Sequence, residues 1–170
     1  ACLNSCMTNT IQKKRAKQET QRYLAESLNA DNTLAITLTQ KQIVDRQRID
    51  DIVSSQNVRH FLNFLNREVY GRRRNAKKQK INVFIVRETS FNDRHHLHLI
   101  VERPFHIRLE DFRVAISRCW MKTKFGYFNV KVDEVHDLSN WTDYMLKQKT
   151  KGDWYDAIDW ENCHLKTAED

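Results

Sequence analysis

A chain of 170 residues with 40% hydrophobic side chains is long enough to form one compact domain around a core. Only 3 Gly and 1 Pro argue against a loop-rich or disordered protein, and no apolar run approaches the roughly 20 residues of a membrane span. The formal net charge of +7 favours a polyanionic partner, with nucleic acid ahead of a membrane.

The N-terminal residues 1–30 are polar and contain a basic cluster from Lys13 to Lys17. We interpret this segment as a basic arm or a short helix that either stays solvated or contacts a DNA backbone. The cysteines lack the two close pairs that are typical of a zinc site, so we interpret them as reduced thiols of an intracellular protein. They are Cys2, Cys6, Cys119 and Cys163.

Residues 33–39 alternate strictly between apolar and polar side chains, which predicts a central strand. Its polar face carries Thr37 and Thr39. Residues 44–70 predict a helix, and Gly71 is its predicted C-cap. The apolar stripe of this helix is spaced for packing on a sheet and consists of Val58, Phe61, Leu62, Leu65 and Val69.

A dense basic segment follows between residues 72 and 80. It either forms a solvated connector or neutralises the phosphates of a nucleic acid. The basic residues are Arg72, Arg73, Arg74, Lys77, Lys78 and Lys80.

Two strands, residues 81–87 and 95–102, are predicted to form a hairpin. Because side chains alternate along a strand, His96 and His98 point to one side, opposite the aliphatic residues between them. They are either ordinary half-buried histidines or a pair that shares a divalent metal ion. The hairpin brings Glu88, at the end of its first strand, toward this pair.

The remaining chain predicts a helix at 109–123 and a strand at 127–135 with Phe128, Val130 and Val132 on one face. Ser139 is the predicted N-cap of a last helix that runs to about residue 150. The tail, 153–170, is a short packing helix or a linker.

The order β-α-β-β-α-β-α predicts an α+β fold, a ferredoxin-like or RRM-like sandwich. We expect a mainly antiparallel sheet of four to five strands with helices on one face. The open face would then gather Thr37, the histidine pair and the last helix.

The last helix contains Tyr144 and Lys147, which are three residues apart and are expected to project together. A tyrosine hydroxyl beside a lysine ammonium suits a nucleophile, although an amphipathic surface helix can carry the same pair. Trp141 and Met145 are expected to pack elsewhere.

On these residues the chain resembles the HUH endonuclease superfamily, which includes the nicking domains of rolling-circle replication (Rep) proteins, relaxases and single-strand transposases. The resemblance rests on three motifs in the family's order: the threonine-ended strand, His96-Leu97-His98, and Tyr-x-x-Lys from Tyr144. It is closest to the one-tyrosine Rep type, because Tyr155 lies too far along the chain to be a paired nucleophile. We expect the endonuclease domain at 31–152.

The resemblance implies that Glu88, His96 and His98 bind Mn²⁺ or Mg²⁺ and that Tyr144 forms a 5′-phosphotyrosine with DNA, assisted by Lys147. The implied activity is site-specific nicking and joining of single-stranded DNA at an origin or hairpin, which initiates rolling-circle replication. Thr37, Thr39 and the basic residues of 72–80 are then expected to contact the DNA.

No helicase-type phosphate loop is present, so any helicase would be a separate protein or a C-terminal domain outside this chain. The expected location is the cytoplasm of a prokaryotic host, or the nucleus if the chain comes from a eukaryotic virus or element.

Three alternatives remain at the level of sequence. A transposase or relaxase of the same superfamily would use the same chemistry. A non-catalytic RRM-like nucleic-acid-binding module would carry aromatic residues on its exposed sheet face, where this chain has histidines. A structural domain with a zinc-bound histidine pair would depend on metal for stability and would form no covalent link to DNA.

Overall fold

The computed structural model describes residues 2–72, 79–89, 95–147 and 154–166 of the chain. The predicted order β-α-β-β-α-β-α is confirmed within these ranges, and the structure adds a long N-terminal helix and a small hairpin. The elements are α1 (Cys2–Ser27), the 3-10 turn η1 (Ala30–Asn32), β1 (Thr33–Gln40), β2 (Ile43–Val44), β3 (Gln47–Arg48), α2 (Asp51–Tyr70), β4 (Val83–Thr89), β5 (His95–Glu102), α3 (Leu109–Met121), β6 (Gly126–Glu134) and α4 (Leu138–Leu146).

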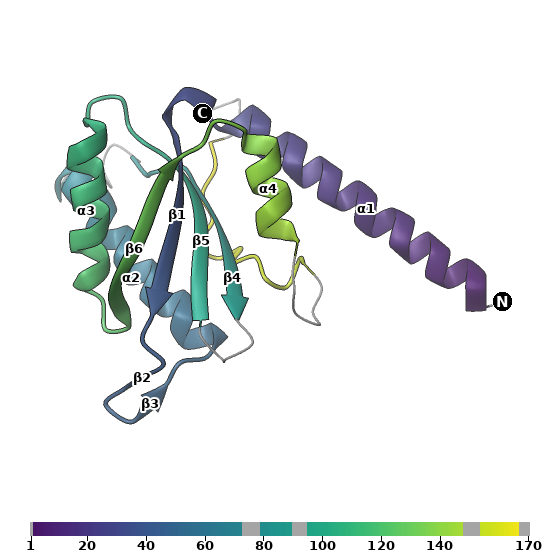
Figure 1. The fold of residues 1–170 in the computed structure, drawn as a ribbon, viewed down its shortest axis with the longest axis horizontal. Coiled ribbons are helices and arrows are strands. Elements are labelled where there is room, and N and C mark those ends of the chain that lie inside the picture. The colour runs from purple at the N-terminus through teal and green to yellow at the C-terminus, as the bar shows by residue number, and fades with distance from the viewer. Residues whose placement is uncertain (1, 73–78, 90–94, 148–153, 167–170) are drawn as a thin grey trace.

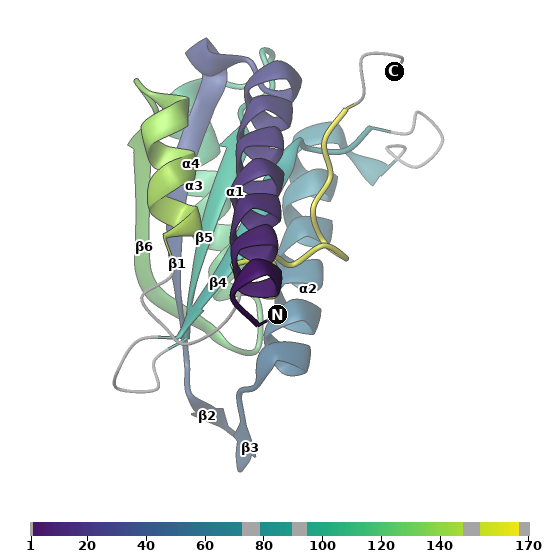
Figure 2. The ribbon, with the colours of Figure 1, turned by 90° about the vertical axis from the view of Figure 1, so that its right-hand side faces the viewer.

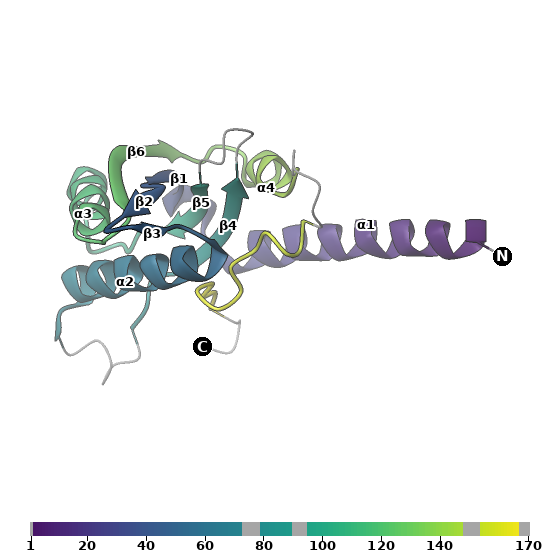
Figure 3. The same ribbon diagram turned by 90° about the horizontal axis from the view of Figure 1, so that it is seen from below.

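In the described residues, four strands form one antiparallel sheet in the order β4-β5-β1-β6 (Figure 1). Helices α2 and α3 cover one face of this sheet, as the view from below shows (Figure 3). The predicted α+β sandwich is therefore confirmed. The main core between these layers includes Leu34, Ile36, Leu38, Val58, Phe61, Leu65, Leu97, Leu99, Val101, Phe112, Ile116 and Trp120.

The predicted start of the second helix, at residue 44, is wrong. Strands β2 and β3 occupy that region and pair through a tight turn, in which Asp45 and Arg46 have φ angles of 49° and 64°. Helix α2 begins only after Asp50, whose carboxylate accepts a hydrogen bond from the first turn of the helix. Its predicted C-cap is confirmed, since Gly71 ends the helix with φ 77°.

The opposite face of the sheet was predicted to be open, but α4 and the end of α1 cover part of it (Figure 2). Phe84 and Ile100 point to this face and are buried. Leu24 of α1, Leu28 just after the end of α1, and Met145 of α4 join them in a second apolar cluster, on which both helices dock. The N-terminal half of α1 extends away from the rest of the fold (Figure 1).

Strand β6 lies beside β1, and its first residues depart from the predicted pattern. Val130 and Val132 pack against the main core, whereas Phe128, which was predicted to share their face, is 71% exposed. The reason is a register shift in the pairing with β1, between Leu38 and Gln40. Such an irregularity rotates the residues beyond it away from the regular alternation.

The C-terminal segment, residues 154–166, runs along the outer edge of β4 and is neither a helix nor a detached tail. It forms β-bridges from Ile158 to Val86 and from His164 to Val83. Four backbone hydrogen bonds of 2.6–3.0 Å connect the segment to β4. A strand edge covered in this way has fewer unpaired N–H and C=O groups to offer another chain.

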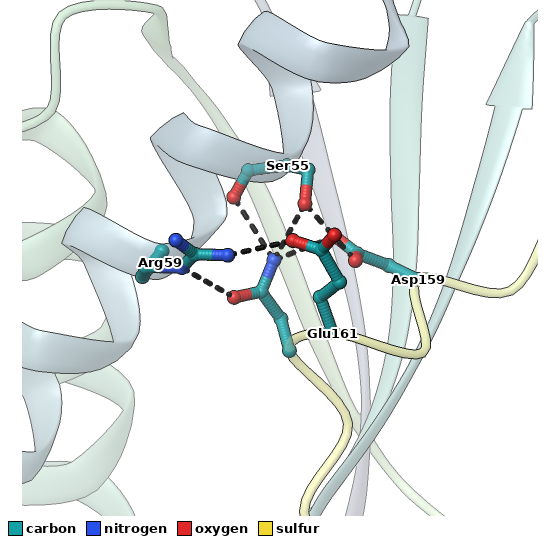
Figure 4. A network of polar contacts seen from close by, with 5 residues as sticks. Ser55, Arg59, Asp159 and Glu161 are labelled. Atoms are coloured by element: carbon teal, nitrogen blue, oxygen red, sulfur yellow. Dashed lines mark hydrogen bonds and ion pairs between the residues drawn. The ribbon is translucent and has the colours of Figure 1, made fainter.

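A buried polar network fixes the same segment to α2 (Figure 4). The Ser55 hydroxyl donates to Asp159 at 3.1 Å, and the Asn162 amide donates to Asp159 at 2.8 Å and to the Ser55 carbonyl at 2.9 Å. At the exposed rim, Arg59 pairs with Glu161 at 2.7 Å. Because buried polar groups that lose a partner are costly, this network favours one position of the segment.

Cys163 offers a probe of this docking. Burial raises the pKa of its thiol to about 12, and its Sγ accepts the Ile85 N–H at 3.3 Å. We expect alkylation of Cys163 at pH 8 to be roughly 10³-fold slower in the native protein than in a free peptide, because the thiolate is the reactive form. Iodoacetamide labelling followed by peptide mass spectrometry measures the rate. Asp159→Ala should accelerate it, and labelling at the peptide rate in the unaltered protein would show that the segment is not docked.

Within the described ranges no helix combines the length and the apolar content that a bilayer crossing requires.

Candidate active site

The candidate site lies on the sheet face opposite α2 and α3, where neighbouring strands place polar side chains side by side. In the register of the sheet, Thr37 is opposite His98 and Thr39 is opposite His96. On the other side of β5, Glu88 is opposite His96. Three strands therefore contribute to one polar patch at the same end of the sheet.

Glu88 reaches the histidine pair, as the predicted hairpin requires. Its Oε2 forms a short hydrogen bond with Nε2 of His98. The His98 side chain is nearly buried and the Glu88 carboxylate is half exposed. The site therefore has an open side on which a ligand can approach the carboxylate.

Two threonine hydroxyls contact the Nδ1 atoms of the histidine pair. Thr37 Oγ1 lies 3.2 Å from Nδ1 of His98, and Thr39 Oγ1 lies 3.4 Å from Nδ1 of His96. A carboxylate only accepts, so in the structure Nε2 of His98 donates to Glu88 and Nδ1 accepts the Thr37 hydroxyl; with a metal ion at Nε2, Nδ1–H would instead donate to that hydroxyl. This contact orients each ring, a role that the sequence did not suggest for either threonine.

The donor set fits a hard or borderline divalent ion in its chemistry. Two imidazole nitrogens and one carboxylate oxygen suit Mn²⁺ and can hold Mg²⁺. In the part of the chain that the structure describes, no three His, Cys, Asp or Glu side chains are close enough to form a complete metal centre. Glu88 and His98 are already in contact, and His96 is the cross-strand neighbour of Glu88.

Tyr144 stands over this patch from α4. Its ring centroid is 6.2 Å from that of His98, with the rings at 85°. On its other side, Trp141 lies edge-on at 5.7 Å. Trp141 was expected to pack elsewhere and instead supports the tyrosine, whereas Met145 packs into the second apolar cluster as expected. Tyr144 is 54% exposed, so a substrate can approach this residue from the solvent side.

The ends of α4 differ from the prediction. Asp137, not Ser139, is the N-cap, because its carboxylate accepts the Asn140 N–H at 3.0 Å. The helix ends at Leu146, and residues 148–150 of the predicted helix lie outside the described residues.

Lys147 is the C-cap residue of α4, and its backbone N–H still bonds to the Asp143 and Tyr144 carbonyls. In the structure its ammonium pairs with the carboxylate of Asp143, the residue before Tyr144. Its Nζ lies 2.9 Å from Oδ2 of Asp143. Hydrogen bonds from Lys17 and then from Lys147 lower the pKa of Asp143 to about 2.

The structure does not bring the described part of the basic segment to the site. Arg72 and Lys80 are exposed. Lys80 precedes the start of β4, whereas Glu88 lies near the end of that strand. The other predicted contacts lie outside the described residues and are Arg73, Arg74, Lys77 and Lys78.

Comparison with known protein families finds a match, over residues 33–153, to a family of replication-associated proteins described under the name ORF2. The matched span exceeds two thirds of the chain and contains the whole four-stranded sheet of the described residues, the histidine pair and Tyr144. No curated protein and no solved structure matched the chain in the corresponding comparisons. On the strength of the family match, the chain belongs to the replication-associated protein ORF2 family.

Proposed function

We propose that this chain is a metal-dependent endonuclease and strand transferase that nicks and rejoins single-stranded DNA to initiate rolling-circle replication. The observation that carries the proposal is the position of Tyr144. Its ring centroid lies 6.2 Å from that of His98, on the sheet face where Glu88 contacts the same histidine. A tyrosine beside two histidines and a carboxylate, in a replication-associated family, suits attack on a phosphodiester.

Glu88, His96 and His98 would hold Mn²⁺ or Mg²⁺, which when bound supplies Lewis-acid polarisation of the scissile phosphate. Thr37 and Thr39 orient the two imidazoles through Nδ1. A hydrogen-bond partner on the ring nitrogen that does not bind the metal fixes the orientation of a metal-binding histidine.

Tyr144 Oη then attacks the phosphorus and forms a phosphotyrosine bond to the 5′ side of the break. The bond from phosphorus to the 3′ oxygen breaks, and that oxygen takes up a proton and leaves as a 3′-hydroxyl. A free tyrosine has a pKa of about 10, so its proton must be lost as the bond forms. Lys147 would stabilise the charge that develops there once its ammonium moves from Asp143. One ester replaces another, so the reverse reaction rejoins the strand without ATP.

A denaturing gel tests the proposal. The protein is incubated with a set of labelled single-stranded oligonucleotides and hairpins in Mn²⁺, and we expect a band of slower mobility that survives SDS and is lost with EDTA. A non-catalytic binding module would shift the DNA on a native gel and leave no band after SDS. That result would contradict the proposal.

The threonine contacts give a second test. Thr37→Val removes the hydroxyl beside His98 and keeps the shape of the side chain. We expect the Mn²⁺ concentration for half-maximal cleavage to rise by about 10- to 100-fold, as is usual when a partner of a metal-binding histidine is lost. Thr33→Val is the matched control, because the Thr33 hydroxyl donates to the Asn29 carbonyl at the far end of the same strand. An equal metal requirement in both variants would exclude an orienting role for Thr37.

A further inference from the structure

Helix α1 lies outside the span that matches the family, which begins at residue 33, yet it docks on the helix that carries Tyr144. The contact uses one stripe of α1. Lys17 and Leu24 are spaced i, i+7, so they share one face of the helix, and Leu28 follows directly after the helix end, with its N–H bonded to the Leu24 carbonyl at 3.1 Å.

The apolar part of the contact is fully buried. Leu24 and Leu28 pack in the second apolar cluster with Met145 and Leu146 from the last turn of α4. Burial of leucine and methionine side chains removes apolar surface from water and holds the two helices at close range. This contact determines which side of α4 faces the sheet.

The polar part of the contact is centred on Asp143. Lys17 Nζ lies 2.8 Å from its Oδ1, and Lys147 Nζ lies 2.9 Å from its Oδ2, so each carboxylate oxygen has its own lysine. We call these residues the Lys17–Asp143–Lys147 cluster. The Lys17 side chain is mostly buried, unlike the exposed Lys147 side chain, so the link to α1 is the more enclosed of the two.

Tyr144 lies in the sequence between Asp143 and Met145, the residues that α1 contacts. Successive residues of an α-helix are rotated by about 100°, so holding the side chains before and after Tyr144 fixes the rotation of α4 about its axis. The rotation of α4 in turn sets where the Tyr144 ring stands over His98.

We propose that α1 is a positioning element of the nicking domain and that Lys17 is the residue through which it places Tyr144, by way of Asp143. The inference rests on the proposed function, since it assigns a role in the same reaction. A misplacement of a reacting group by about 1 Å can cost on the order of 10²-fold in rate. Because Leu24 and Leu28 keep their contacts when Lys17 is lost, we expect a smaller effect, about 10-fold.

The test compares Lys17→Met with Arg22→Met and Lys17→Arg. Methionine keeps much of the aliphatic length and removes the charge. Arg22 pairs with Glu26 within α1, so its loss removes an ion pair of the same helix without touching the cluster. We expect Lys17→Met to lower the rate of adduct formation at saturating DNA and Mn²⁺ about 10-fold with an unchanged Kd for DNA. Arg22→Met and Lys17→Arg should keep the wild-type rate.

A rise in Kd with an unchanged saturating rate would show that Lys17 contacts DNA, and it would overturn the inference. Hydrogen exchange tests the contact without reference to catalysis, because Lys17→Met should speed exchange of the α4 amides and leave those of α2 unchanged. Unchanged exchange in α4 would overturn the positioning role. The absence of any Tyr144-dependent adduct from the wild-type protein would instead contradict the proposed function.

Discussion

Replacement of Tyr144 by phenylalanine is expected to abolish the covalent adduct and to leave the affinity for single-stranded DNA unchanged. The substitution removes only the Oη atom that would form the bond to phosphorus. The ring keeps its contacts with His98 and Trp141, so the shape of the site is preserved. Adduct yield on a denaturing gel and Kd from fluorescence anisotropy measure the two quantities separately.

Tyr155→Phe is the matched control for this experiment. Tyr155 is 53% exposed, nearly as much as Tyr144, but it lies on the C-terminal segment and stacks near Trp160. We expect wild-type adduct formation from the Tyr155 variant. An undiminished adduct from Tyr144→Phe, or its loss from Tyr155→Phe, would assign the nucleophile elsewhere.

Substitution of His98 by alanine should have the second large effect. Loss of an outer partner of a metal-binding histidine costs roughly 10- to 100-fold in metal affinity, so loss of the ligand itself should exceed roughly 100-fold. We expect the cleavage rate at limiting Mn²⁺ to fall by at least this factor, with partial recovery at high Mn²⁺. A Mn²⁺ titration of the rate makes the measurement, and far-UV circular dichroism checks that the variant is folded.

His95→Ala is the control, because adjacent residues of a strand point to opposite faces and His95 is therefore directed away from His96. Glu88→Ala should also lower the cleavage rate at limiting Mn²⁺, because Glu88 contacts the His98 imidazole. Wild-type activity of Glu88→Ala at limiting Mn²⁺ would remove Glu88 from the metal site, while loss of activity in His95→Ala would contradict its place outside the site.

The strands and the main core could be predicted because each element buries one face, and this leaves a periodic pattern of apolar residues in the sequence. Leu34, Ile36 and Leu38 alternate, and the stripe of α2 repeats at helical spacing. The hairpin of β2 and β3 left no such signal, because its turn uses Asp45 and Arg46 in a conformation that usually favours Gly or Asn. The docking of α1 was missed for a similar reason, since it buries only the end of a long polar helix.

The candidate site could be predicted as far as it lies within one hairpin. The alternation of β5 pairs His96 with His98, and the short connection to β4 brings Glu88 near them. The contacts of Thr37 and Thr39 depend on the register of β1 against β5, which are far apart in the sequence. The pairing of Lys147 with Asp143 follows the i, i+4 spacing of a helix, whereas the contact of Lys17 with the same carboxylate depends on how α1 docks, which local spacing does not determine.

The second apolar cluster has a consequence for synthesis of the protein. It joins Leu24 and Leu28 from near the start of the chain to Ala157 and Ile158 from near its end, around the strands between them. The buried residues of the main core all precede β6, but this cluster cannot close until residues beyond 158 have left the ribosome. The support beneath Tyr144 is therefore completed late, so a nascent chain forms the strand that carries its histidine pair before it fixes the position of Tyr144.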